Sequence, residues 1–125
     1  MSGPVERWWE AVAARDWERA AAQLHPEVVV DWPATGERLR GRDAFLEVQR
    51  IYPEGWEIEV RRVLHDGDRV AVEARVPHGG EVFFCAGFYE VAGGLVVRAV
   101  EHWSAGSAAP APAWRAHLVE RLDER

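Results

Sequence analysis

The side chain with the clearest capacity for chemistry is that of Glu101, in the apolar segment Leu95–Trp103 that follows a Gly-Gly turn. The β-branched residues of this segment favour a strand. Side chains alternate between the faces of a strand, so Ala99, Glu101 and Trp103 share one face and Val100 lies on the other. If the Trp103 face points into the core, Glu101 is buried with it and must find a partner, hold a proton or transfer one. If Val100 faces the core instead, Glu101 is a solvated surface acid.

Two further interpretations stand beside proton transfer by Glu101. An ion pair between Glu101 and Arg98 or Arg115 fits the sequence as well as a catalytic role does. Asp31 is the second candidate acid, but it precedes Trp32, and only one of two adjacent strand residues points inward. Trp32 is the better core residue, although the sequence leaves open which of the two faces inward.

Patterns for metal, phosphate or cofactor binding do not occur in the sequence. The histidines are scattered, and no pair of them has metal-ligand spacing on one expected element. The pairs Gly79-Gly80 and Gly93-Gly94 lie where hairpins need a positive φ, rather than in a phosphate-binding loop. Cys85 stands alone between Phe84 and Ala86, which favours a small core residue over a nucleophile. We therefore expect neither a metal nor a cofactor.

The N-terminal half predicts helices and a hairpin that would position these acids. Apolar residues recur every three or four positions from Val5 to Leu24, which indicates amphipathic helix. Asp16 interrupts this pattern and suits an N-cap, so we expect two helices. A hairpin follows over residues 28–40, and a third helix runs from about Gly41 to Ile51.

The C-terminal half predicts an antiparallel meander. Its four strands span residues 56–65, 69–77, 81–92 and 95–103, and their short connections require hairpins. Residues 82–88 are apolar on both faces, so we expect a homodimer that covers the outer face of the sheet. After a Pro- and Ala-rich linker over residues 104–112, helical spacing predicts a helix at 113–123. We expect its Trp114 to cover part of the mouth of the fold.

Length and charge limit the classes of function. The chain of 125 residues fits a single domain, residues 1–125. Its formal net charge of -6 and its lack of a basic run argue against nucleic acid and membrane partners. The start of the sequence lacks a basic segment followed by an apolar one, and no apolar run approaches membrane-spanning length, so we expect a cytoplasmic protein.

Several short segments, in this order of elements, resemble a known superfamily. They are Gly41-Arg42-Asp43-Ala44 at a helix start, residues 66–72 in a hairpin, and Phe88-Tyr89-Glu90-Val91 ahead of Gly94-Leu95-Val96. Together they resemble the SnoaL-like, polyketide-cyclase-type branch of the nuclear transport factor 2-like superfamily, and the tail resembles an uncharacterised bacterial group in it. The resemblance implies an α+β fold: a cone-shaped curved antiparallel sheet, a four-strand meander plus a short hairpin, wrapped around three helices and enclosing a pocket.

The resemblance does not extend to the reactions of the best-known members. The polar trio of ketosteroid isomerase falls near Trp8, Trp32 and Ala86, none of which can replace it. An epoxide hydrolase of limonene type needs an arginine and two acids around a water molecule, whereas Glu73 and Arg75 are expected on the outer face of their strand.

The resemblance therefore implies a pocket for a small apolar organic molecule. Either a cofactor-free acid–base enzyme of isomerase, cyclase or hydrolase type or a non-catalytic ligand-binding or dimeric scaffold protein fits it. The expected catalytic residues are Glu101 as the first candidate and Asp31 as the second. The expected ligand-binding residues share aromatic rings: Trp8, Trp32, Tyr52, Phe84, Phe88 and Trp103.

Overall fold

The computed structural model describes residues 3–122. Its helices are α1 (Pro4–Ala13), α2 (Trp17–Ala21) and α3 (Arg42–Ile51), followed near the C-terminus by a 3-10 helix, η1 (Ala116–Leu118). Its strands are β1 (Leu24–Trp32), β2 (Glu37–Arg40), β3 (Glu59–Asp66), β4 (Arg69–His78), β5 (Glu81–Ala92) and β6 (Leu95–Ala105). None of the helices in residues 3–122 is long and apolar enough to cross a membrane.

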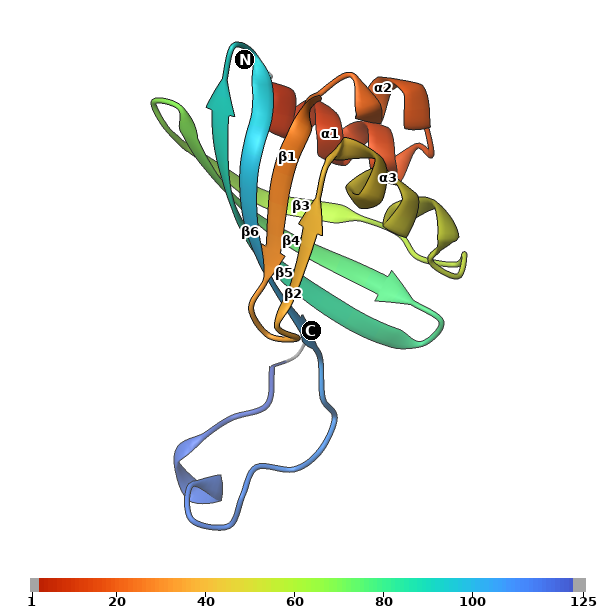
Figure 1. Ribbon diagram of the computed structural model, residues 1–125. Coiled ribbons are helices and arrows are strands. Elements are labelled where there is room, and N and C mark those ends of the chain that lie inside the picture. Colours follow the sequence, from red (N-terminus) through yellow and green to blue (C-terminus); the bar gives the residue numbers. More distant parts are fainter. Residues whose placement is uncertain (1–2, 123–125) are drawn as a thin grey trace.

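The strands form one curved, six-stranded sheet in the order β2-β1-β6-β5-β4-β3. Figure 1 shows α1, α2 and α3 together on one side of this sheet, with the long strands curving around them. The expected α+β cone, a meander and a hairpin around three helices, is confirmed. One feature differs from the expected antiparallel sheet: β1 pairs with β6 in parallel, so the sheet is mixed.

The helix boundaries follow local chemistry. Asp16 accepts a hydrogen bond from the Arg19 amide at 3.1 Å, which confirms it as the N-cap of α2. Gly41 precedes α3 with a φ of 91°, a conformation that favours glycine. The end of α2 lies earlier than expected, because β1 already begins at Leu24, before Pro26.

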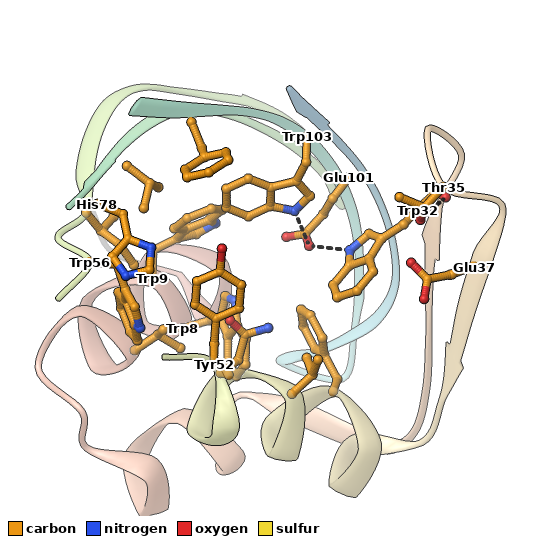
Figure 2. Close-up of a pocket in the computed structure, with 17 residues that line it drawn as sticks. Trp8, Trp9, Trp32, Thr35, Glu37, Tyr52, Trp56, His78, Glu101 and Trp103 are labelled. Carbon is orange, nitrogen blue, oxygen red and sulfur yellow. Dashed lines mark hydrogen bonds between the residues drawn. The ribbon is translucent and has the colours of Figure 1, made fainter. Parts of the chain in front are cut away.

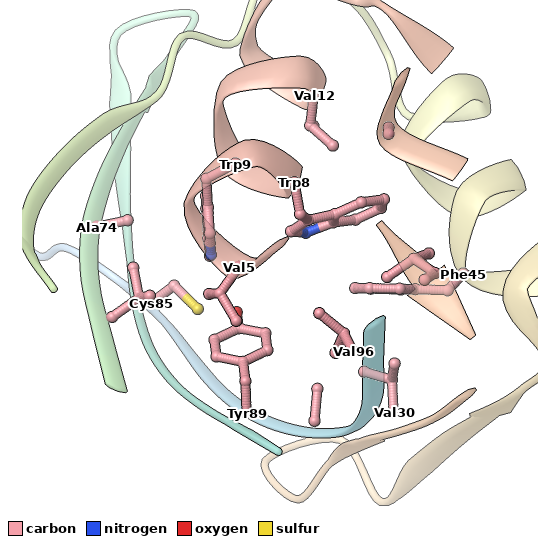
Figure 3. Close-up of a cluster of buried hydrophobic side chains, with 14 of the residues drawn as sticks. Val5, Trp8, Trp9, Val12, Val30, Phe45, Ala74, Cys85, Tyr89 and Val96 are labelled. Atoms are coloured by element: carbon pink, nitrogen blue, oxygen red, sulfur yellow. The ribbon is translucent and has the colours of Figure 1, made fainter. Parts of the chain in front are cut away.

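The core lies between the helices and the inner face of the sheet. Val5, Trp8 and Val12 of α1 are almost fully buried, as is Phe45 of α3. The rings of Trp8 and Phe45 stack with their centroids 4.6 Å apart (Figure 3). Burying one such side chain contributes about 1.5–3 kcal/mol, so these contacts fix the two helices against each other.

A β-bulge in the β5–β6 hairpin decides which side chains point inward. Near the turn, Ala92 pairs with Leu95 and Val91 with Val96, but Glu90 then pairs with Arg98. Val97 is therefore an extra residue on β6. Because side chains alternate along a strand, one extra residue exchanges the inner and outer faces of β5 relative to β6.

The C-terminal segment differs from expectation. After β6 it contains only the three-residue η1 where a helix over 113–123 was expected; residue 123 lies outside the described residues. Trp114 is 73% exposed, so the expectation that it covers the mouth of the fold is wrong. Figure 1 shows this segment leading away from the sheet and the helices. A short amphipathic stretch without a packing partner is too short to form a stable helix by itself.

Candidate functional site

A cavity of about 260 Å³ lies between the helices and the inner face of the sheet. Most of its wall is apolar, and much of it is aromatic (Figure 2). The aromatic residues come from α1, β1, α3, β5, β6 and the segment before β3: Trp8, Trp9, Trp32, Phe45, Tyr52, Trp56, Phe83 and Trp103. Such a wall suits an organic ligand whose surface is mostly apolar.

The carboxyl group of Glu101 borders this cavity and is the most deeply buried acid on its wall. Glu101 is 2% exposed. Its Oε1 accepts hydrogen bonds from the indole Nε1 of Trp32 at 3.0 Å and of Trp103 at 3.3 Å (Figure 2). Its Oε2 accepts a short hydrogen bond of 2.5 Å from the Tyr89 hydroxyl. Three neutral donors from β1, β5 and β6 thus converge on one carboxyl group.

Gly87 provides the space that lets Tyr89 reach Glu101. It pairs directly with Glu101 across the β5–β6 ladder, and Tyr89 lies two residues further along the same face. A Cβ atom at position 87 would lie 2.5 Å from the Tyr89 hydroxyl oxygen, closer than any side chain tolerates. A glycine inside a strand often marks such a close approach, and here it allows the phenol ring to lie over the sheet.

Burial raises the pKa of Glu101 above its ordinary value, while the hydrogen bonds from Tyr89, Trp32 and Trp103 act in the opposite direction. Indole N–H groups can only donate, so Oε1 cannot carry the proton while it accepts from both indoles. When Glu101 is protonated, its proton must therefore lie on Oε2, next to the Tyr89 hydroxyl. Burial and the nearby Glu101 raise the pKa of Tyr89, so this hydroxyl keeps its own proton.

Asp31 lies on the opposite face of the sheet. Its carboxylate accepts hydrogen bonds from Arg38 at 2.6 Å and from Arg98 at 2.7 Å. The hydrogen bond from Arg38 lowers the pKa of Asp31. Trp32, its neighbour, lines the cavity, which decides the question that the sequence left open. Asp31 is therefore not part of the site, and the expected role for it there is wrong.

The alternative ion pair for Glu101 is also excluded. Arg98 binds Asp31, and the guanidinium of Arg115 lies 5.1 Å from the centre of the exposed Trp114 ring. The polar groups that contact Glu101 are neutral.

Four of the six expected ligand-binding residues line the cavity: Trp8, Trp32, Tyr52 and Trp103. Phe84 and Phe88 do not, and their assignment is wrong. Phe88 is 54% exposed and packs edge-on against His102 of β6. The bulge is the physical reason. A regular hairpin from the Ala92–Leu95 pair would place Phe84 opposite Trp103, whereas the observed partner of Trp103 is Cys85.

Sequence reasoning missed several residues of the site. Phe83 and Trp56 line the cavity, and Arg15 places its guanidinium 3.2 Å from the centre of the Trp56 ring. Gly87 was the one sequence signal of the contact between Tyr89 and Glu101, because a glycine in an otherwise apolar strand indicates a bulge or a close contact. Tyr89 could have been found only with the correct register.

Within residues 3–122, no three His, Cys, Asp or Glu side chains are grouped so that they could hold a metal ion. His78 lies on the cavity wall, whereas His65 contacts Glu6 at 2.8 Å and does not line this cavity. Of the two acids on the cavity wall, Glu37 and Glu101, Glu101 is the more deeply buried.

The curved sheet around three helices is the architecture of the nuclear transport factor 2-like superfamily. Within it, the chain belongs to the SnoaL-like domain family, which residues 5–99 match. No curated protein sequence matches the chain.

Solved structures agree with this assignment. A protein from Kribbella flavida, described as a "putative ketosteroid isomerase", is 35% identical, with a TM-score of 0.85 over 95% of this chain and 87% of that one. An NTF2-like protein of unknown function from Burkholderia xenovorans is 25% identical, with a TM-score of 0.75 over 95% of this chain and 92% of that one. An "LEH-like epoxide hydrolase" from M. tuberculosis is 21% identical, with a TM-score of 0.68 over 81% of this chain and 80% of that one, and shares the fold.

Proposed function

We propose that this protein binds a small, largely apolar organic molecule in the cavity and that Glu101 exchanges a proton with it without a cofactor. The reaction would be of isomerase, cyclase or hydrolase type. The observation that carries the proposal is the burial of the Glu101 carboxyl group, 2% exposed, in the wall of an otherwise mostly apolar cavity. A carboxyl group with a raised pKa in such a place is suited to general acid–base catalysis.

The form of the cavity supports a ligand of modest size. A volume of about 260 Å³ is near the lower end of small-molecule sites. Figure 2 shows Tyr52 and His78 pointing toward the cavity from its edge, opposite the Glu101 side. These two side chains could bind a polar atom at the far end of a ligand whose reacting atom lies near Glu101.

Ligand binding is tested with a pair of variants on α3. Val48 lines the cavity, so Val48→Trp should fill it, whereas Ile51 is 68% exposed and Ile51→Trp should leave it open. Naphthalene is a suitable neutral probe, and quenching of tryptophan fluorescence reports its binding. We expect the wild type and Ile51→Trp to bind and Val48→Trp not to bind. Equal binding by both variants would refute the cavity as the site.

Proton transfer is tested without knowledge of the substrate. 2-Tetralone is a flat, largely apolar ketone, and exchange of its α-protons in D₂O is followed by NMR. A positioned base contributes about 10²–10⁴-fold to proton transfer. We expect the wild type to accelerate the exchange and Glu101→Gln to lose this acceleration.

One observation favours a second candidate, a non-catalytic ligand-binding protein. The three donors nearest Glu101 already bind its carboxyl group, whereas proton abstraction also needs a donor for the developing oxyanion. Naphthalene binding without accelerated exchange of 2-tetralone would select this candidate.

We further infer that two copies of the chain pair through the outer face of the sheet. Phe88 is 54% exposed on this face, and its direct neighbours across the ladder are Ala71 and Val100. An exposed apolar patch on a sheet is suited to an isologous contact. Light scattering should give twice the chain mass of 14.1 kDa for the wild type and a single chain mass for Phe88→Glu. A monomeric wild type at micromolar concentration would contradict this inference.

A further inference from the structure

The cavity wall carries acids but no arginine. Glu37 and Glu101 line it, and His78 is its one basic residue among the described residues. The chain contains no lysine, so all 15 of its lysine-or-arginine positions are arginines. Arg38 and Arg98 form ion pairs with Asp31 on the opposite face of the sheet. Arg15 contacts the ring of Trp56, but it does not line the cavity itself, and its charge is paired with Glu54 at 2.9 Å. The acids that line the cavity therefore face no arginine on its wall.

Glu101 has neutral donors where a buried carboxylate ordinarily has a cation. Tyr89, Trp32 and Trp103 satisfy three of the roughly four acceptor positions that a carboxylate offers. They supply no positive charge, so the ionised form stays costly in this apolar surrounding. A cation in the cavity would supply the missing charge and lower that cost.

The aromatic rings of the wall add a second attraction for a cation. The faces of tryptophan and tyrosine rings carry negative potential and attract ammonium groups, more strongly where water is excluded. Five tryptophans line the cavity, and Figure 2 shows the rings of Trp32 and Trp103 on either side of the Glu101 carboxyl group. Aromatic rings around a carboxylate form a well-suited site for an alkylammonium ion.

We propose that the ligand is a hydrophobic organic ammonium ion, a protonated amine or a quaternary ammonium compound, whose nitrogen lies near Glu101 among the indole rings. The inference rests on the proposed ligand binding in this cavity and does not require catalysis. The apolar groups of this ligand would pack against the rest of the aromatic wall. Glu101 and Glu37 would repel an anionic ligand of the same shape.

The test uses two probes of the same shape and different charge. Phenyltrimethylammonium and tert-butylbenzene differ by one positive charge at the central atom of the substituent. Their affinities are measured by calorimetry and by quenching of tryptophan fluorescence. We expect the cation to bind at least about tenfold more tightly, because charge pairing and the ring faces act on it alone.

Variants locate the effect. Glu101→Gln should weaken binding of phenyltrimethylammonium by about tenfold or more and change binding of tert-butylbenzene by less than about threefold. The matched control is Glu73→Gln, because Glu73 contacts Arg62 on the outer face, and this variant should bind both probes as the wild type does. Circular dichroism confirms that each variant is folded.

The outcomes separate this inference from the proposal on which it rests. If tert-butylbenzene binds as tightly as the cation or more tightly, the ammonium inference is overturned and ligand binding in the cavity stands. If neither probe binds, ligand binding itself is refuted. If the cation binds equally well to the wild type and Glu101→Gln, Glu101 is not its partner and the inference fails.

Discussion

Replacing Tyr89 by phenylalanine tests how far the buried acid depends on its neutral donors. Tyr89 is 2% exposed, and its hydroxyl donates to Glu101 Oε2 at 2.5 Å. Phenylalanine keeps the ring and removes only the hydroxyl group, so the packing of the core is nearly unchanged. The variant should lose the hydrogen bond and leave one oxygen of the carboxyl group without its donor.

The size of the effect depends on the charge of Glu101. A hydrogen bond to a charged group contributes about 1.5–3 kcal/mol to stability, and one between neutral groups about 0.5–1.5 kcal/mol. The hydrogen bond from Tyr89 lowers the pKa of Glu101 against the larger effect of burial, so its loss must raise that pKa further. The free energy lost on substitution should therefore grow as pH rises through the folded pKa of Glu101 and then level off.

Urea unfolding, followed by circular dichroism from about pH 4 to about pH 9, measures this difference. With a urea m value of about 1–3 kcal/mol/M, a loss of about 2 kcal/mol lowers the midpoint by about 1 M. The chain has one other tyrosine, Tyr52, which is 46% exposed. Tyr52→Phe is the matched control and should change stability by less than about 0.5 kcal/mol.

A double-variant cycle with Glu101→Gln isolates the pair. In the Gln background no charge is present, so Tyr89→Phe should cost about 1 kcal/mol at every pH. If Tyr89→Phe is as stable as Tyr52→Phe across the pH range, the short hydrogen bond does not stabilise the fold. If the loss is independent of pH with Glu101 present, the carboxyl group does not ionise in this range and the argument about its charge is refuted.

Four further predictions concern the two acids, Gly87 and the C-terminal segment. Glu101→Gln should be at least as stable as the wild type at neutral pH in urea unfolding. Burial raises the folded pKa of Glu101, so the wild type loses stability as pH rises from the unfolded pKa to the folded one. The Gln variant has no carboxyl group to ionise and does not lose this stability. Asp31→Asn should behave in the opposite way in urea titrations, losing stability at neutral pH and matching the wild type in acid, because Arg38 lowers the pKa of Asp31; equal pH profiles for the two variants would contradict both assignments. Gly87→Ala should force the Tyr89 ring aside and cost about 1–3 kcal/mol in the same unfolding assay, and an unchanged midpoint would show that the ring has other space. Deleting residues 107–125 should leave the thermal midpoint and naphthalene binding unchanged, since none of the described residues of this segment lines the cavity, and a large loss of either would show that the segment docks.

The two-residue period of β6 was enough to predict part of the cavity wall. In β6 the two-residue alternation predicts a shared face for Ala99, Glu101 and Trp103, and the structure has these side chains on the inner face. The same rule failed for β5, where Phe84 and Phe88 were expected inward. Alternation fixes which residues of one strand share a face, but the relation between two strands depends on register.

The register of β5 could not be predicted because both of its faces are apolar. In a strand with one polar face, a slip of one residue would bury charged side chains, and the pattern would reveal the correct register. Here Phe83 and Cys85 can replace Phe84 and Ala86 on the inner face without an evident penalty. The bulge at Val97 is then a property of the assembled sheet rather than of the hairpin sequence.

The two candidate acids, Asp31 and Glu101, have different surroundings because they lie on opposite faces of the sheet. Asp31 and Glu101 lie on neighbouring strands, β1 and β6, but on opposite faces. Asp31 has two arginines, and its pKa is lowered, so ionisation stabilises the fold and the group is suited to a structural role. Glu101 has three neutral donors, and burial raises its pKa, so its ionisation destabilises the fold in the absence of a cationic partner. An apolar side chain of similar volume would fill the Glu101 position at lower cost, whereas a carboxyl group at a cavity wall gains stability from a ligand that shares its proton or supplies a positive charge. The proposed site therefore rests on the position of an acid that has no cationic partner, rather than on the number of acids.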